Sequence, residues 1–366
     1  MIKKLKQAKY KRPFFSIIIS CYNSGEYLDF LLESLCHQGI KKEEYEIVIS
    51  DDCSTESYDY ILDKFRDKLI IRKVVAEKNY GYPGPTREQG RNFARGEWII
   101  FSDHDDAFFK DALKQVKRYI KKNNPQYAVY TIVQVGKMET REPIEDYEND
   151  AVTHGKFYNL DNLMNKYNIH YNMKLRTEED IYFNTSINIL VDLDLITIDQ
   201  TDIYAYIWYC NNHKSISHSR INDREFAEYT HNDFLRATFY VFFKALDDYN
   251  YPPEEFLYRF INSIMFSYGI INKFIFKRGF DDHYKENDYC AAQMFKMVQD
   301  RFDFVDVKYI MDFISENNGL MFYESFRSVV ECVGAFIPRY SIEDWLNYLV
   351  SLFPELENKP DYFKDY

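Results

Sequence analysis

Short apolar runs alternate with helical segments along the first third of this chain, and that alternation restricts the folds open to it. Four runs rich in β-branched and aromatic residues are typical of buried strands, and they lie at 14–20, 45–50, 69–75 and 98–101. Apolar residues at helical spacing follow the first two runs. Regular alternation of strand and helix predicts an α/β fold, in which a largely parallel sheet is covered by helices on both faces.

Polar residues cluster where three of these strands are expected to end, at 20–23, 51–55 and 103–106. The carboxyl ends of parallel strands meet at one edge of the sheet, and ligands of such sheets bind in the crevice beyond that edge. The three clusters are therefore predicted to share one rim.

The last cluster holds three carboxylates within four residues, Asp103, Asp105 and Asp106. So much negative charge is costly to hold together unless a cation or a proton neutralises part of it. Carboxylate oxygens suit Mg²⁺ or Mn²⁺, and a site of two or three carboxylates leaves coordination positions open for a diphosphate. These residues alone leave a second interpretation open, in which Asp105 and Asp106 cap a helix beginning near Phe108.

The second cluster, with Asp51 and Asp52, again places carboxylates at a strand end, where they can accept hydrogen bonds from a ribose or a base. A cap of the next helix is the alternative. The sequence contains neither GxGxxG nor GxxxxGK[ST], so phosphates must be held by other means. A metal together with Arg87 is the predicted substitute, although Arg87 is also consistent with a solvated helix residue.

Composition indicates a folded, two-domain protein. The 366 residues are 46% hydrophobic and 18% aromatic, which is sufficient for more than one core. Six cysteines without a CxxC pair suggest a reducing compartment and no structural zinc. We find no signal peptide and no apolar run near the roughly 20 residues that cross a bilayer, and we therefore expect a soluble, cytoplasmic protein.

Charge is distributed unevenly. The chain has a net charge of −12, yet its first twelve residues carry six basic side chains and no acidic one. An acidic body disfavours a protein that grips long stretches of nucleic acid. The basic start is consistent with peripheral contact at the inner face of a membrane, where each Lys or Arg contributes about 1 kcal/mol. A frayed, solvated terminus is the alternative.

Three segments together resemble the core of the family 2 glycosyltransferases of the GT-A fold. They are SIIISCYN at 16–23, EIVISDDCS at 46–54, and the stretch 87–106, which ends in GEWIIFSDHDD. They occur in the family's order and spacing over about 100 residues. The resemblance implies a Rossmann-like GT-A domain at 14–222 that uses a nucleotide sugar, preceded by a basic extension at 1–13.

The resemblance also assigns donor-site residues. The nucleotide would be held by Ser20, Tyr22, Asn23 and Asp52, and Arg87 would lie near the diphosphate. Asp103-His104-Asp105 matches the DxD motif, with Asp105 the direct metal ligand and Asp106 a neighbour that orients it. Two positions depart from the family pattern, because Ser20 replaces a usual Pro and Glu88 replaces the Asn of an RNxG segment.

Sugar transfer also requires a base, because the acceptor hydroxyl must lose its proton as it attacks. The run Glu178-Glu179-Asp180 resembles the family segment that supplies this base, with Asp180 the match and Glu179 the fallback. The same run is also an ordinary acidic helix N-terminus. Further along, 206–217 resembles the segment that closes the catalytic domain, in which His213 would meet the diphosphate or the metal and Lys214 would offset phosphate charge. Purely structural roles for both residues are the alternative.

Beyond about residue 223 the pattern becomes helical without strand punctuation, which predicts an all-α domain at 223–366. Such a domain could bind acceptor or form a homo-oligomer. The expected function is Mn²⁺- or Mg²⁺-dependent, inverting transfer of a sugar, from a UDP-sugar, to a glycan or cell-envelope polymer. Two alternatives stay open, namely a sugar transferase acting on a modified nucleobase or on protein, and a non-catalytic module that binds nucleotide sugars.

Overall fold

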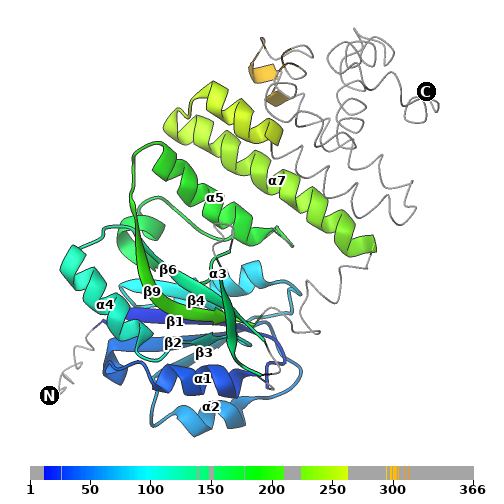
Figure 1. Ribbon diagram of the computed structural model, residues 1–366. Coiled ribbons are helices and arrows are strands. Elements are labelled where there is room, and N and C mark those ends of the chain that lie inside the picture. Colours follow the sequence, from blue (N-terminus) through cyan, green and yellow to red (C-terminus); the bar gives the residue numbers. More distant parts are fainter. Residues whose placement is uncertain are drawn as a thin grey trace, which may run out of the picture. The chain divides into compact units, whose positions relative to one another are not determined.

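The computed structural model describes residues 12–25, 27–137, 140–147, 152–176, 178–209 and 224–262, with a few single positions up to 312 (Figure 1). The chain divides into two compact units, Met1–His218 and Ser219–Tyr366, and each is described by itself.

Of the predicted basic extension at 1–13, only Arg12 and Pro13 are described. The Arg12 guanidinium pairs with Asp161 and donates to the carbonyl oxygens of Arg95 and Gly96.

The first unit is built on one mixed sheet, whose first half is parallel. Its strands run in the order β3-β2-β1-β4, and every neighbouring pair is parallel. Their bounds are β1 Phe15–Cys21, β2 Tyr45–Asp51, β3 Ile71–Val75 and β4 Trp98–Asp103. The four strands predicted from sequence are thus confirmed, with ends that differ by a residue or two.

The second half of the sheet is mixed, so the prediction of a largely parallel sheet holds only for the first half. The second half continues from β4 through β8, β6, β9 and β5, with β7 paired to β6. Only the β6–β9 pair is parallel among these contacts. The bounds are β5 Ala107–Phe108, β6 Ala128–Gly136, β7 Pro143–Tyr147, β8 Lys156–Asn159 and β9 Ile198–Trp208.

Helices cover both faces of this sheet (Figure 1). Along β1, Ile17 and Ile19 belong to a core shared with α1, α2 and α4, whereas Ile18 lies under Gly90 of α3. The helices are α1 Leu28–Cys36, α2 Asp59–Phe65, α3 Pro83–Phe93, α4 Ala112–Asn123 and α5 Glu179–Asp192, with short turns at Lys42–Glu44 and Leu160–Asn165.

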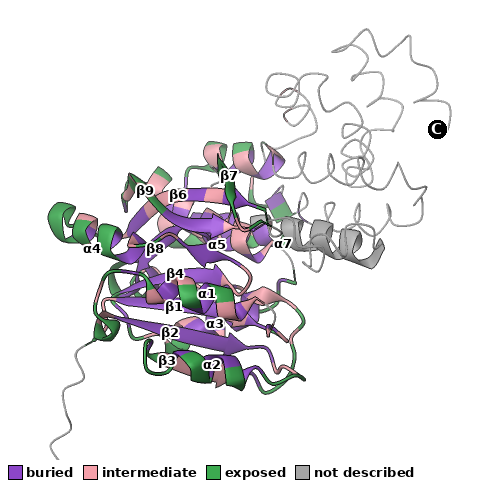
Figure 2. Cartoon of the chain, turned by 60° about the horizontal axis from the view of Figure 1, so that its bottom comes forward, coloured by how far each residue is buried: buried purple, intermediate pink, exposed green. Residues whose placement is uncertain are grey.

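Burial explains why the central strands read as continuous apolar runs. Every residue of β2 is buried, and β1 is buried except for a half-buried Ser20 (Figure 2). Strands covered on both faces need apolar side chains on both, and each buried Ile or Val contributes about 1.5–3 kcal/mol. The polar residues are thereby displaced to the strand ends, where the functional site is found.

In the second unit, the described residues are mainly helical. They comprise α7 Arg224–Tyr249 and a helix at 253–262, and their rings form one aromatic cluster of Phe239, Phe243, Phe256 and Phe260. These rings therefore pack against one another as core. The later helices predicted from sequence fall mostly outside the described residues. Within the described part of the chain, no helix combines the length and apolarity required to span a bilayer.

Close backbone approach at Gly96, in the turn before β4, provides a test of the fold. A Cβ there would lie 2.5 Å from the Ser16 nitrogen and 2.7 Å from the Phe15 carbonyl carbon, and backbone cannot move aside as a side chain can. We expect Gly96→Ala to lower the free energy of unfolding by about 1–3 kcal/mol, as overpacking does. At Gly25 the nearest atom to an added Cβ is 3.6 Å away, so Gly25→Ala should change stability by less than about 0.5 kcal/mol. Denaturant unfolding of both variants measures the difference, and equal losses would contradict this packing.

Candidate active site

The parallel register places the three polar clusters along one rim. Ser20 pairs with Ser50 on one side and with Asp103 on the other, and Cys21 pairs with Asp51. The clusters at 20–23, 51–55 and 103–106 are therefore neighbours at the carboxyl edge, as the sequence pattern predicted. Neither acidic cluster caps a helix, because α2 begins at Asp59 and α4 at Ala112.

Arg87 connects this rim to α5. Its Nη2 donates to Asp103 Oδ1 at 3.0 Å, and its Nη1 donates to Glu179 Oε1 at 2.7 Å. The arginine is only 6% exposed, which excludes the interpretation of a solvated helix residue. Its guanidinium also lies over the ring of Tyr171, 5.7 Å from the centroid. Arg87 thus joins a carboxylate at the end of β4 to one at the start of α5.

The packing of α3 explains this position. Proline at the first helical residues suits a helix start, and α3 opens with Pro83-Gly84-Pro85. The missing side chain at Gly84 admits Glu179, whose Cβ would lie 3.3 Å from a Cβ there. The buried Ser50 hydroxyl donates to the carbonyl of Thr86 at 2.6 Å, which fastens the same turn to β2. The first turns of α3 are therefore held between the sheet and α5.

The charged groups around Arg87 shift one another's pKa values. Burial opposes ionisation of Asp103, but Arg87 and then His154 outweigh it and hold the pKa of that carboxyl well below its usual range. Burial and the neighbouring charge of Asp180 raise the pKa of Glu179 to about 7, against the pull of Arg87. Asp103 is therefore the permanent anion of this network, and Glu179 exchanges its proton near neutral pH.

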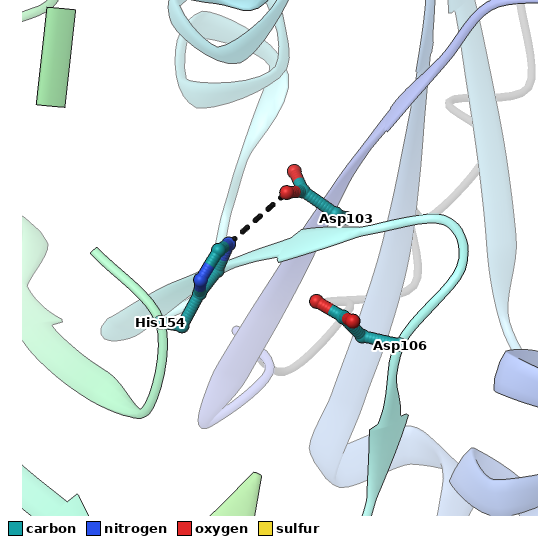
Figure 3. Close-up of side chains that lie close together, drawn as sticks. All are labelled: Asp103, Asp106 and His154. Atoms are coloured by element: carbon teal, nitrogen blue, oxygen red, sulfur yellow. Dashed lines mark hydrogen bonds and ion pairs between the residues drawn. The ribbon is translucent and has the colours of Figure 1, made fainter. Parts of the chain in front are cut away.

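A second group forms on the other side of Asp103 (Figure 3). Asp103, Asp106 and His154 each offer one ligand atom, and these atoms lie within 4.8 Å of one another. His154 Nε2 is 3.2 Å from Asp103 Oδ2. Asp106 is 1% exposed and accepts hydrogen bonds from the Tyr206 hydroxyl at 2.7 Å and the Tyr209 N–H at 2.9 Å. Burial, followed by the charge of Asp105, raises the pKa of Asp106 far above its usual range.

This donor set fits a divalent cation. Two carboxylates and an imidazole within one coordination sphere are ligands that Mn²⁺ or a similar ion accepts. Burial favours a proton on Asp106, and a bound cation would supply positive charge in place of that proton. The predicted ligand Asp105 is half-buried and lies outside the three-residue group, so its role as direct ligand stays a prediction, whereas Asp103 and Asp106 are both members.

The predicted nucleotide residues organise the adjoining loops. The Asp52 carboxylate accepts the N–H groups of Tyr80 and Gly81, both at 2.9 Å, and so fastens the loop before α3. The Asn23 side chain accepts from the N–H of Thr55 at 2.9 Å and from that of Glu56 at 3.0 Å, which ties the β1 and β2 loops together. Their contact with a nucleotide stays a prediction.

Two other predicted nucleotide residues leave groups available at the rim. Tyr22 is 45% exposed, and the buried Ser20 hydroxyl has no hydrogen-bond partner among the described residues. The Asp51 carboxylate is already engaged within the protein, because the Tyr58 hydroxyl, the Ser54 N–H and Lys73 all bind it. Those contacts outweigh burial and lower the pKa of Asp51.

The predicted base lies beside this network. Asp180 is half-buried in the first turn of α5, next to Glu179, and its charge acts on both Arg87 and Glu179. The acidic run is thus a helix N-terminus and a neighbour of the site at once.

His213 and Lys214 lie outside the described residues. His154 and Tyr206 were missed, because the sequence shows no ligand spacing around His154 and Tyr206 appeared only within an aromatic segment.

Known proteins with the same pattern support a family assignment. Residues 16–184 match Glycosyl transferase family 2. Poly(ribitol-phosphate) beta-N-acetylglucosaminyltransferase TarS of Staphylococcus aureus (strain Mu50 / ATCC 700699) is 41% identical over 106 residues, which are 29% of this chain and 18% of TarS. Poly(ribitol-phosphate) beta-N-acetylglucosaminyltransferase TarP of S. aureus (strain N315) is 26% identical over 238 residues, covering 61% of this chain and 72% of TarP. The chain therefore matches less than a fifth of the TarS sequence.

Solved structures agree on the fold. The crystal structure of S. aureus TarS 1-349 in complex with UDP-GlcNAc superposes with a TM-score of 0.63 at 19% identity, covering 87% of this chain and 89% of that one. Residues 16–184 are a family 2 glycosyltransferase domain, and its architecture is the GT-A fold that the sequence predicted.

The buried position of Arg87 makes its removal costly. Arg87→Met leaves Asp103 and Glu179 without their cation, and breaking a buried pair in this way costs about 3–5 kcal/mol of unfolding free energy. We expect the double variant Arg87→Met/Glu179→Gln to lose less than the sum of the two single changes. Arg66→Met is the matched control, because that arginine is 71% exposed in its pair with Asp63 and should change stability by less than about 0.5 kcal/mol. Similar losses for the two arginines would contradict the bridge.

Proposed function

We propose that this domain transfers a sugar from a UDP-sugar to a hydroxyl of an anionic cell-wall polymer of the poly(ribitol phosphate) type. The observation that carries the proposal is the Arg87 bridge between Asp103 and Glu179. It brings the end of the DxD strand, the candidate phosphate-binding arginine and the candidate base segment into direct contact, although they are far apart in the sequence.

The donor end of the site follows from charge. A leaving diphosphate gains negative charge as the sugar departs, and fixed cations nearby stabilise that charge. Arg87 is one such cation, since its guanidinium is anchored by two carboxylates and covered by Tyr171. Asp103 and Asp106 would hold a divalent ion, which when bound supplies further positive charge at the diphosphate. Tyr22 offers an exposed ring at the same rim, and the buried Ser20 hydroxyl there has no partner among the described residues.

Asp180 is the better candidate for the base. Glu179 is 7% exposed and its Oε1 is held by Arg87, so it is poorly placed to accept a proton from an acceptor. Asp180 is half-buried, and its Oδ1 accepts from the neighbouring N–H of Ile181 at 3.0 Å. Asp180 therefore removes the acceptor proton, and Glu179 positions Arg87. Attack opposite the leaving diphosphate inverts the anomeric centre, an outcome taken from the family resemblance.

The polymer acceptor is supported by the relatives. TarS and TarP are both named as poly(ribitol-phosphate) N-acetylglucosaminyltransferases, and a third relative, from Bacillus spizizenii, is named as a poly(ribitol-phosphate) beta-glucosyltransferase and is 38% identical over 112 residues. The donors implied by those names are GlcNAc or glucose carried on a nucleotide. We further propose activity at the cytoplasmic side, as expected from the sequence.

Release of free nucleotide tests donor and metal together. We expect the purified chain with poly(ribitol phosphate) to release UDP from UDP-GlcNAc or UDP-glucose in the presence of Mn²⁺, and to release little GDP from GDP-mannose. EDTA should abolish release, and added Mn²⁺ should restore it. Chromatography of the polymer then shows whether sugar is attached. Binding of UDP-GlcNAc without release from any donor would instead indicate a binding module.

Substitution of the base separates binding from transfer. We expect Asp180→Asn to lower kcat by about 10²–10⁴-fold, the usual contribution of a general base, while the Kd for the UDP-sugar stays within about threefold. Asp63→Asn, an exposed carboxylate on α2, serves as the control and should transfer normally. Steady-state kinetics and calorimetric donor binding give the two quantities. Undiminished transfer by the Asp180 variant would remove it from the mechanism.

A further inference from the structure

We infer that His154 is a nitrogen ligand of the divalent cation and gives the site a preference for Mn²⁺ over Mg²⁺. This inference rests on the proposed function, whose cation it concerns. His154 is 8% exposed and lies just before β8, in the mixed half of the sheet. Its Nε2 is the atom closest to the acidic group, at 3.2 Å from Asp103 Oδ2, and Figure 3 shows Asp106 on the other side of the same space.

Tyr206 fixes all three members of the group. Its ring is stacked on His154, with centroids 5.2 Å apart and planes 5° from parallel. Its hydroxyl donates to Asp106 Oδ2 at 2.7 Å and accepts the N–H of Asp103 at 3.0 Å. One side chain of β9 therefore orients the imidazole and the Asp106 carboxylate and also binds the backbone of Asp103. Metal ligands are commonly held by such outer contacts, which fix their orientation before the ion arrives.

The imidazole is able to take the required protonation state. A histidine that binds a metal through Nε2 must carry its remaining proton on Nδ1. Nδ1 of His154 is buried and has no hydrogen-bond partner among the described residues. No neighbouring N–H or O–H therefore prevents Nδ1 from carrying that proton. In this structure Nε2 faces the anionic Asp103 carboxylate and donates its own proton to it, and a cation bound between the two groups would take the place of that proton.

Ligand chemistry leads to the metal preference. Carboxylate and water oxygens suit Mg²⁺ and Mn²⁺ alike, whereas imidazole nitrogen favours transition metals. A site of carboxylates alone would discriminate little between the two ions. Adding His154 shifts the balance towards Mn²⁺. The competing explanation is that His154 only donates a hydrogen bond to Asp103, and the two roles differ in whether nitrogen touches the ion.

Pulsed electron paramagnetic resonance distinguishes these roles. We expect Mn²⁺ bound to the wild-type chain to show coupling to a directly bonded imidazole nitrogen. We expect His154→Asn to lose that coupling, to bind Mn²⁺ at least about tenfold more weakly and to reduce the preference for Mn²⁺ over Mg²⁺. Tyr206→Phe, which keeps the stacked ring but loses the hydroxyl, should weaken Mn²⁺ binding by about tenfold and retain the coupling. His37→Asn is the control, because that histidine lies on the surface beside Glu33.

The wild-type spectrum alone can overturn the inference, even if a variant fails to fold. Bound Mn²⁺ without nitrogen coupling would refute it, as would coupling that survives in a folded His154→Asn protein. Wild-type protein that releases UDP yet binds no Mn²⁺ would also refute it and leave the proposed transfer standing. Nitrogen-coordinated Mn²⁺ in a protein that releases UDP from no donor would support this inference while the proposed function fails.

Discussion

A buried guanidinium between two carboxylates is the constraint on which the site depends. Arg87 is almost completely buried, so its charge requires partners, and Asp103 and Glu179 supply them from two different elements. Satisfying that one charge requires the end of β4, the first turns of α3 and the start of α5 to converge. Apolar residues in place of Arg87, Asp103 and Glu179 would avoid the same burial cost, so the presence of these charges is consistent with a role in the site's chemistry.

Asp103 belongs to two networks at once. One of its oxygens accepts from Arg87 and the other faces His154, so the carboxylate links a fixed cation to the candidate metal group. Its low pKa, caused by those same neighbours, keeps it ionised. Asp106 is the opposite case, since burial and Asp105 raise its pKa. Two aspartates three residues apart thus have pKa values shifted in opposite directions by their surroundings, which composition alone does not reveal.

The sequence predicted the parallel half of the sheet because its signals are local. The run at 98–101, for example, is apolar, β-branched and followed by acidic residues, and it forms β4. The mixed half depends on pairing between distant segments, and β8 and β5 contain only four and two residues. His154 lies in that half, 51 positions from Asp103, so no spacing rule connects the two. The acidic cluster at the end of β4 was therefore foreseeable, and the imidazole beside it was not.

The site forms only if the long strand β9 pairs with β6 in the correct register. This eleven-residue strand pairs with β6 through two irregular steps before Val133 meets Tyr206. Because side chains alternate between faces, a slip of a single position would turn the Tyr206 ring and hydroxyl away from the acidic group. A misaligned strand would leave a compact protein without its site, so the bulges, whose extra residues lie in β9, set the geometry of the site.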